Sequence, residues 1–325
     1  MIVGVGSLKK TGIYKAARSF FYWNFVEKRV IRTVVNDCVE RSLRLSSQKK
    51  DMVFYMAAAP GESQLVLDLI DSIKYYTEAD WGLVIQGDGL SEEEVRLYEE
   101  CGALVGNNPV PLKFDGLFYT VRSALTIARS AFDAAFYIKL DSDSLMINPL
   151  HLGDLEAVFS SDPGLGMAGS FLRDWDGSER DFSSWRDKMF MQRRSLEPVY
   201  GMARNYGYDG EGVQGGVYII TRRAVDLMYE KGFLTKWNSV RILRPWRVAE
   251  DHLFTMMVYA CKMKVACVGG VNGLVVSAYP SFPEADPMIF KNEGRVFVHP
   301  LKKNDREIRI RELYRRLRGK VAGSF

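Results

Sequence analysis

The chain has 325 residues, of which 47% are hydrophobic, 26% charged and 12% aromatic, and its formal net charge is +4. A chain of this size and composition buries a sizeable core, which excludes a disordered or fibrous protein. Its four cysteines are too few and too scattered for a disulfide scaffold, and none forms a CxxC pair suited to zinc or redox chemistry, so a reducing compartment fits best. No run of about 18 apolar residues occurs and the N-terminus lacks the order of a secretory signal, so we expect a cytoplasmic protein.

The charge is segregated along the sequence. Residues 1–50 carry a net +8 and residues 302–320 a net +6, which leaves −10 for residues 51–301. Basic ends suit an anionic partner, so we expect them either to contact an anionic surface on the inner face of the membrane or to pack against the acidic middle. The acidic middle argues against nucleic acid as a partner. The chain therefore divides into a basic, aromatic-rich helical extension at 1–50, a globular domain at 51–301 and a basic helix or tail at 302–325.

The residue pattern of each basic end predicts helical structure. Residues 13–35 mix aromatic and β-branched residues with regular basic ones, so one or two helices with an apolar and a cationic side are expected. These helices would either pack on the core or lie in a membrane surface. The aromatic residues that would enter the membrane are Phe20, Phe21, Trp23 and Phe25. Residues 302–320 leave the same choice, with an apolar face expected at Ile308, Leu313, Tyr314 and Leu317.

From residue 52 the sequence alternates strands and helices. Strands are predicted at 52–60, 81–89, 103–109 and 134–140, and helices at 62–76, 91–102 and 117–132. Repeated βα units of this length predict an α/β fold with a mixed, mainly parallel sheet flanked by helices. Ligands of such sheets bind at the carboxyl ends of the strands, where Pro60, Asp88 and Asp141 lie.

An acidic pair follows the predicted strand at 134–140. Asp141 and Asp143 lie two residues apart, so one turn can aim both carboxylates at the same crevice. Carboxylates that close repel each other, which favours a bound cation, and oxygen ligands favour Mg²⁺ or Mn²⁺. A solvated turn is the alternative.

Histidine and lysine near the C-terminus supply further candidate ligands. His299 ends a predicted strand and is followed by Pro300 and Lys302, so an imidazole for the same metal and an ammonium for a phosphate are available. We interpret the other two histidines, His151 and His252, as structural.

Two further motifs lie between these segments. Gly215 and Gly216 open a predicted strand and would let the backbone approach a ligand closely, or they form a β-bulge. Glu250 and Asp251 begin an apolar helix and would serve as a catalytic base, or Asp251 caps the helix.

Taken in order, these segments resemble the GT-A glycosyltransferases, enzymes that move sugars from nucleotide-sugar donors. The four matching motifs are the DxD motif at Asp141-Ser142-Asp143, the glycine-rich loop at Gln214-Gly215-Gly216, the xED motif at Ala249-Glu250-Asp251 and the C-terminal histidine at His299. The resemblance covers roughly residues 51–302. It implies a Rossmann-like GT-A catalytic domain whose nucleotide-binding half is 51–150 and whose acceptor-binding half is 151–301.

The resemblance also implies a role for each motif. Asp141 and Asp143, with Ser142 between them, would bind the donor and hold Mn²⁺ or Mg²⁺, and His299 would complete the coordination. Asp251, with Glu250 beside it, would deprotonate the acceptor hydroxyl if the anomeric centre inverts, which is the outcome we prefer.

Donor contacts are implied at further positions. They are Ala58, Ala59, Pro60 and Asp88 for the base and ribose, Gly215 and Gly216 for the sugar and phosphate, and Lys302 for the diphosphate. The expected donor is a UDP-sugar, and the expected acceptor is a glycan, a lipid-linked molecule or a protein.

Residues 171–212 lie outside the resemblance and show little periodicity. Several aromatic and basic side chains there offer stacking and anion-binding surfaces for an acceptor. They are Trp175, Trp185, Tyr200, Tyr206, Tyr208, Arg193 and Arg194. An ordinary packed insertion is the alternative.

Two other functions compete with sugar transfer. A strand that ends in DxD also suits a phosphatase of the haloacid dehalogenase type, with Asp141 as nucleophile and Asp143 as general acid, although several βα units precede the motif here. The basic ends suit a non-catalytic adaptor at the membrane surface, built on a transferase-like core.

Overall fold

The structure is a computed structural model that describes residues 45–108, 116–236, 248–271, 273–302 and 304–319, together with Cys38, Glu40 and Leu112. The helices predicted at 13–35 lie outside the described residues. Among the residues described, no helix combines the length and the apolar composition needed to cross a bilayer.

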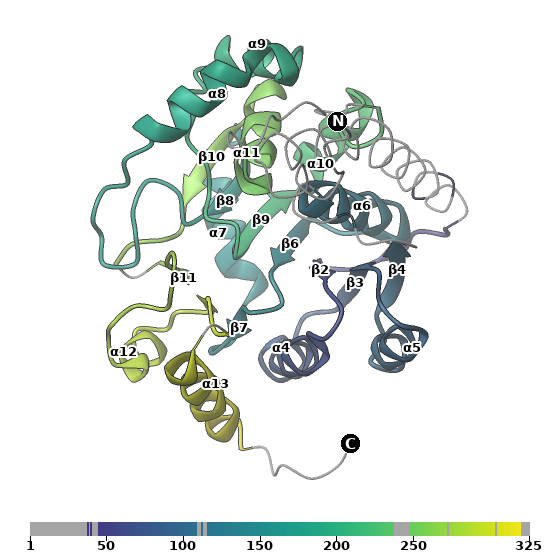
Figure 1. The fold of residues 1–325 in the computed structure, drawn as a ribbon, viewed down its shortest axis with the longest axis vertical. Coiled ribbons are helices and arrows are strands. Elements are labelled where there is room, and N and C mark those ends of the chain that lie inside the picture. Colours follow the sequence, from purple (N-terminus) through teal and green to yellow (C-terminus); the bar gives the residue numbers. More distant parts are fainter. Residues whose placement is uncertain are drawn as a thin grey trace, which may run out of the picture.

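A seven-stranded sheet forms the centre of the described chain (Figure 1). Its strands, in spatial order, are β10 (Lys264–Cys267), β8 (Leu165–Gly169), β9 (Val217–Thr221), β6 (Phe136–Leu140), β2 (Met52–Ala58), β3 (Trp81–Asp88) and β4 (Leu104–Asn108). Strand β9 runs antiparallel to β6 and β8, and the other neighbouring pairs are parallel. The predicted α/β class with a mixed, mainly parallel sheet is therefore confirmed.

Helices cover both faces of this sheet. One face packs against α4 (Ser63–Tyr76), α5 (Glu92–Glu100) and α7 (Leu152–Ser160), and the other against α6 (Gly116–Ala131), α10 (Arg222–Glu230) and α11 (Glu250–Ala260). Figure 1 shows α4 and α5 on one side of the sheet and α6, α10 and α11 on the other. The strands and helices predicted between residues 52 and 140 are confirmed.

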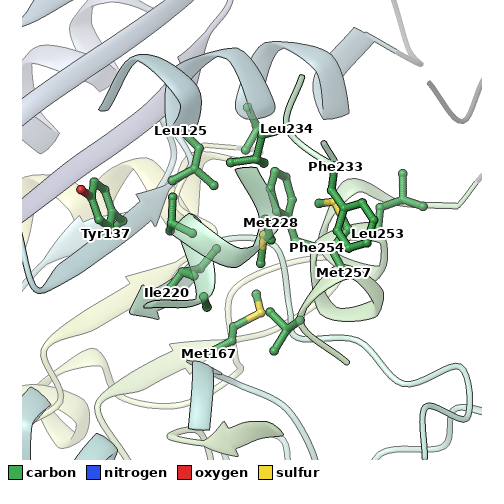
Figure 2. Close-up of a cluster of buried hydrophobic side chains, with 14 of the residues drawn as sticks. Leu125, Tyr137, Met167, Ile220, Met228, Phe233, Leu234, Leu253, Phe254 and Met257 are labelled. Atoms are coloured by element: carbon green, nitrogen blue, oxygen red, sulfur yellow. The ribbon is translucent and has the colours of Figure 1, made fainter. Parts of the chain in front are cut away.

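The alternation of side chains along β6 divides the core in two. Phe136, Ile138 and Leu140 point to the face covered by α4, and Tyr137 points to the face covered by α6 and α11. Figure 2 shows the second cluster, in which side chains of α6, α10 and α11 pack against the sheet. Lys139 shares the parity of Tyr137, so its side chain enters this apolar layer, where it is fully buried.

A smaller, three-stranded sheet lies beside the large one. It consists of β11 (Val275–Ser277), β12 (Phe297–His299) and β7 (Leu145–Met146), with β12 in the middle. Phe297 lies opposite Met146 and Val298 opposite Leu145 in the antiparallel pair, so the chain leaves β12 beside the turn that precedes β7. Helices α12 (Pro287–Asn292) and α13 (Asp305–Leu317) pack against this sheet.

The predicted C-terminal helix is present as α13, but its buried face differs from the predicted one. Ile308 and Leu317 are exposed, whereas Ile310 and Tyr314 are buried. The face is set by ion pairs rather than by apolar residues alone, because Asp68 of α4 binds three arginines of the C-terminal segment. These are Arg311 and Arg315, at 2.6 and 3.0 Å, and Arg318, at 2.5 Å. This part of the basic C-terminus therefore packs on the core.

The remaining elements are short or lie in the segment without periodicity. They are β1 (Gln48–Lys49) and β5 (Phe132–Asp133), which form a parallel pair, and α8 (Ser183–Leu196) and α9 (Val199–Arg204).

Candidate active site

Strand directions gather the predicted residues at one edge of the sheet. Strands β2, β3 and β6 are parallel, so their carboxyl ends, near Ala58, Asp88 and Asp141, face the same way. Strand β9 runs in the opposite direction, and therefore its beginning, with the preceding glycines, reaches this edge. The backbone amide of Asp141 donates to the carbonyl of Gly216 at 2.9 Å, which fixes the glycine loop to the DxD turn.

Three metal-ligating side chains converge here. One ligand atom each from Asp141, Asp143 and His299 lies within 4.8 Å of the others. His299 Nε2 is 3.3 Å from Asp143 Oδ1 and 3.7 Å from Asp141 Oδ2. Two carboxylates and one imidazole form a donor set that suits Mn²⁺ or Mg²⁺ with positions left for other ligands. The sheet pairing of β12 with β7 explains how His299, far away in sequence, reaches the acidic turn.

The surroundings of His299 are built closely around its ring. A Cβ placed on Gly216 would lie 2.2 Å from His299 Cγ, so only glycine fits there. Ser277 Oγ lies 3.3 Å from Nδ1 of the same ring. With a metal bound, a proton on Nδ1 would be donated to this hydroxyl, and the lone pair of Nε2 would be available to the metal.

Cations hold Asp143 in its charged form. Burial by itself would raise its pKa, but the hydrogen bond and charge of His299, together with the charge of Lys302, outweigh burial and lower the pKa well below its usual range. Lys302 Nζ is 3.5 Å from Asp143 Oδ2. Burial lowers the pKa of Lys302, and the charges of Asp143 and Glu62 more than compensate, so its pKa is raised.

Glu62 links three parts of the site. It lies at the start of α4, after the turn that holds Pro60, and accepts a hydrogen bond from Ser142 Oγ at 2.7 Å. Its other carboxylate oxygen is 3.2 Å from Lys302 Nζ. Glu62 therefore holds Lys302 beside the DxD turn.

A second acidic group begins helix α11. Glu250 is buried and Asp251 is half-buried, and burial raises the pKa of Glu250 to about 7 and that of Asp251 to about 6. A Cβ on Gly215 would lie 3.2 Å from Asp251 Oδ2 and 3.3 Å from Glu250 Oε1. The glycine pair therefore separates the acidic pair of α11 on one side from His299 on the other.

Lys139 contacts the glycine loop and an acidic residue on each side of it. Its ammonium is 2.5 Å from Asp141 Oδ1 and 3.1 Å from Glu250 Oε1, and it donates a hydrogen bond to the carbonyl of Gly215. Burial lowers the pKa of Lys139, but the charges of Asp141 and Glu250 outweigh burial and raise it. The side chain thus remains a cation and contacts both acidic groups.

The residues predicted to bind the base and ribose lie at the ends of β2 and β3. Ala58 is buried, whereas Ala59 and Pro60 are exposed. Asp88 accepts hydrogen bonds from Asn108 Nδ2 at 2.8 Å and from the backbone amide of Leu112 at 2.9 Å. Asp88 therefore connects Leu112 to the end of β3, and a ribose contact there stays a prediction.

Part of the segment at 171–212 packs against the protein, and many of its other residues are exposed. The ring of Trp185 stacks on His252 at 4.1 Å between centroids and has Lys188 Nζ 4.0 Å from its own centroid. Tyr208 is buried, and Trp175 packs edge-on against Phe290 of α12. Burial lowers the pKa of His252 to about 3, so this ring is neutral. The other four aromatic and basic residues singled out from the sequence are half-buried or exposed.

Sequence reasoning missed Lys139, Glu62 and Ser277. Lys139 left a signal, because it is the single charged residue in the apolar strand FYIKL, immediately before the DxD motif. Glu62 and Ser277 left none, because an acidic residue at the start of a helix and a serine at the end of a strand are ordinary in a sequence. His151, which together with His252 was interpreted as structural, is exposed.

Comparisons with known proteins give structural matches only. No protein-family model matches the chain, and the comparison with curated proteins finds no relative. Among solved structures, the bifunctional glycosyltransferase WbbM matches with 12% identity and a TM-score of 0.43 over 78% of this chain, which spans 46% of that protein. The galactosyltransferase LgtC, in complex with donor and acceptor sugar analogs, matches with 14% identity and a TM-score of 0.44 over 84% of this chain and 98% of its own. The mannosyltransferase PcManGT from Pyrobaculum calidifontis, in complex with GDP-Man and Mn²⁺, matches with 10% identity and a TM-score of 0.42 over 87% of this chain and 72% of its own. All three of these solved structures are of glycosyltransferases.

Proposed function

We propose that this protein is a metal-dependent glycosyltransferase that moves a sugar from a nucleoside-diphosphate sugar, with UDP as the expected nucleotide, to an acceptor hydroxyl. The observation that carries the proposal is the convergence of Asp141, Asp143 and His299 within 4.8 Å at the carboxyl edge of a mainly parallel sheet. A cationic Lys302 lies beside this cluster, and Asp251 lies on the other side of the glycine pair. Metal ligands, a diphosphate partner and a base are the groups that this reaction requires.

The residues fit a divalent metal. Asp141, Asp143 and His299 would hold it, since Gly216 leaves the space that the imidazole fills and Ser277 faces the second ring nitrogen. When bound, Mn²⁺ or Mg²⁺ supplies a positive charge that stabilises the departing diphosphate. Lys302 turns from Glu62 to the same diphosphate and neutralises part of its charge. Gly215 and Gly216 present backbone without side chains, so the donor can approach closely.

Asp251 is the candidate base. It is the less buried of the two acids on α11, whereas Glu250 is buried and paired to Lys139. A carboxylate whose pKa is raised toward neutrality accepts a proton more readily than an ordinary aspartate, so Asp251 would take the proton of the acceptor hydroxyl in an inverting transfer. In this proposal Glu250, which pairs with Lys139, supports Asp251 and does not itself act as the base.

The phosphatase alternative conflicts with the environment of Asp143. This residue would have to carry a proton to act as a general acid, but His299 and Lys302 hold its pKa below the usual range. The adaptor alternative gives no reason for metal ligands, a diphosphate partner and a base to meet at one edge.

Nucleotide binding tests the proposal. Titration calorimetry of the full chain with UDP should show binding with Mn²⁺ and little binding with EDTA, because the metal that Asp141, Asp143 and His299 would hold would supply positive charge for the diphosphate. Asp143→Asn keeps the shape of the side chain and removes its charge, so the Mn²⁺-dependent affinity should fall by about 10- to 100-fold.

Asp162→Asn is the matched control. It also converts an aspartate to an amide, but Asp162 lies on the surface, where it pairs with Lys264 at 2.7 Å. This variant should bind UDP like the wild type. Equal affinity of Asp143→Asn and the wild type, or binding unaffected by EDTA, would contradict the metal site.

A further inference from the structure

Lys139 occupies the centre of a row of polar side chains that crosses three strands. Tyr55 of β2 and Tyr218 of β9 lie opposite Lys139 of β6 in the sheet register. All three side chains are fully buried on the face covered by α6 and α11. Burial raises the pKa of both tyrosines well above the ordinary value, so their hydroxyls stay neutral and Lys139 is the cation of the row.

The Lys139 ammonium contacts three groups. It donates hydrogen bonds to Asp141 Oδ1 and to the Gly215 carbonyl, and it forms an ion pair with Glu250, whose Oε1 lies 3.1 Å from Nζ. An ammonium has three donors and no acceptor, so it can serve three such groups at once. The three partners belong to three different motifs, namely the DxD turn, the glycine loop and the acidic start of α11.

This arrangement restricts Asp141. Lys139 engages Oδ1, and Oδ2 is left on the side of His299, at 3.7 Å from its Nε2. The carboxylate therefore cannot rotate freely, and it presents one oxygen to the metal cluster. Lys139 also contacts Glu250 and the Gly215 carbonyl, and these two contacts fix the start of α11 relative to the glycine loop.

Stability alone is a poor reason for a buried lysine in an apolar strand. Removing an ammonium from water is costly, and well-packed apolar residues often replace buried ion pairs without loss of stability. Lys139 is the one charged residue of strand β6, whose sequence is FYIKL, and an apolar pair in place of Lys139 and Glu250 would be compatible with the layer. The three contacts therefore favour a role in the arrangement of the site.

We propose that Lys139 is a positioning residue that holds the metal-binding end and the base end of the site in one arrangement, through Asp141, the Gly215 carbonyl and Glu250. This inference rests on the proposed glycosyltransferase function. The donor would still be anchored by Asp143, His299 and Lys302 without it, but Asp251 would no longer be fixed relative to the donor. Loss of Lys139 therefore reduces turnover much more than nucleotide affinity.

The test uses Lys139→Met, Glu250→Gln and the double variant, all in the full chain. Methionine is also unbranched, is one atom shorter and removes the ammonium. Glutamine at 250 keeps an oxygen that can contact Lys139, so this single change should cost less. Arg129→Met is the matched control, because it also breaks an ion pair, with Asp226 at 2.8 Å, away from the carboxyl edge of the sheet.

Each variant is measured for the release of UDP from a UDP-sugar and for the Mn²⁺-dependent dissociation constant of UDP, at a temperature where its thermal unfolding curve shows it folded. Lys139→Met should lower turnover by about 100-fold, the usual cost of a misplaced group, while the dissociation constant changes far less. The double variant should be no slower than Lys139→Met, because residues that act as a unit are not additive. Arg129→Met should turn over like the wild type.

Three results would overturn the inference. They are wild-type turnover in folded Lys139→Met, an equal loss in Arg129→Met, and losses that multiply in the double variant. If Lys139→Met does not fold, the double variant is compared with Glu250→Gln, and equal turnover of these two also overturns the inference. A wild type that neither binds UDP with Mn²⁺ nor releases it from a UDP-sugar overturns the proposed function and this inference with it, whereas a functional wild type separates the two.

Discussion

At the scale of single residues, the candidate site depends on how closely side chains and backbone fit. His299 reaches the two aspartates only because the position beside its ring is glycine, and the two acids of α11 lie against the other glycine of the pair. A glycine in such a place serves by the absence of a side chain rather than by flexibility. The close approach at Gly216 leads to a direct test.

Gly216→Ala should displace the imidazole of His299. The new Cβ would lie 2.2 Å from His299 Cγ, which is too close for two carbon atoms that are not bonded to each other. The ring must therefore move away from the carboxylates. Mn²⁺-dependent UDP affinity should fall by about 10- to 100-fold, as measured by calorimetry. Gly153→Ala is the control, because nothing lies within 4 Å of a Cβ at that position. Unchanged affinity in Gly216→Ala would show that His299 takes no part in metal binding.

Asp251, the proposed base, would give the proposed reaction a characteristic dependence on pH. Burial raises the pKa of Asp251 to about 6, and only the ionised carboxylate accepts a proton. The value of kcat/KM should therefore rise with pH through about 6 and level off above it, since this quantity reports the free enzyme. Asp251→Asn should lower kcat/KM by about 10²- to 10⁴-fold and abolish this rise. A profile that is flat between pH 5 and 8 would exclude Asp251 as the base.

At single positions, the sequence indicates which chemistry a side chain can perform more clearly than it indicates what that side chain contacts. The DxD pair and His299 were identified because their side chains are typical metal ligands at strand ends. Lys139 was passed over because it stands in an apolar strand, and only the sheet register shows that it faces Glu250, more than a hundred positions away. Ser277 and Glu62 are commonplace in the sequence and gain a role only from what lies beside them.

At the scale of elements, helix α13 depends on one acidic residue of α4. Asp68 is buried and binds Arg311, Arg315 and Arg318, and the side chains of Arg311 and Arg318 are buried with it. Burial raises the pKa of Asp68, but the three arginines outweigh burial and lower it. Arg311 also donates to the carbonyl of Ser144, at 3.4 Å, in the turn after the DxD motif. The helix is thus tied to the site as well as to the core.

Asp68→Asn should therefore destabilise the protein strongly. Amide replacement leaves the buried arginines without their carboxylate, so the free energy of unfolding should fall by about 3–5 kcal/mol, as measured with urea. Arg316→Gln, on the exposed side of α13, should change it by less than about 0.5 kcal/mol. A small effect of Asp68→Asn would contradict the ion-pair account of α13 docking.

The same carboxylate makes part of this stability sensitive to acid. The pKa of Asp68 is lower in the folded protein than in the unfolded chain, so its contribution is present above the unfolded pKa of about 3.9 and is lost as the pH falls through the folded value. Unfolding of the wild type and of Asp68→Asn should therefore become more alike at low pH.

The elements themselves could be predicted where their patterns are regular. The βα units between residues 52 and 140 have clear periodicity and were found as expected. Helix α8 was not, because its mixture of basic, polar and aromatic residues, SSWRDKMFMQRRSL, lacks a continuous apolar face. The face of α13 was predicted wrongly since hydrophobic periodicity takes no account of buried arginines paired to Asp68.

At the scale of the whole molecule, the sheet order explains why the site needs residues from distant parts of the sequence. Strands from both sides of residue 150 form one sheet, and antiparallel β9 inserts between parallel neighbours. The small sheet then brings β12 to the turn after β6. Strand types follow from the sequence, but strand order and register depend on long-range pairing, which one sequence does not contain.

The segregation of charge also has a partial explanation at this scale. The basic C-terminal segment meets acidic groups of the core, since Arg311, Arg315 and Arg318 bind Asp68 and Lys302 binds Glu62. The N-terminal extension at 1–50 lies mostly outside the described residues, and its contact with an anionic membrane surface stays a prediction.

The most direct test of sugar transfer is to follow the nucleotide by ³¹P NMR. The full chain is incubated with UDP-glucose, UDP-galactose or UDP-N-acetylglucosamine, with simple sugar acceptors and with a phosphomonoester, in the presence of Mg²⁺, which does not broaden the signals. We predict that the resonances of one donor are replaced by those of UDP, without orthophosphate, and that EDTA or Asp143→Asn stops the change. Release of orthophosphate from a phosphomonoester, with every nucleotide sugar intact, would contradict the account and favour the phosphatase.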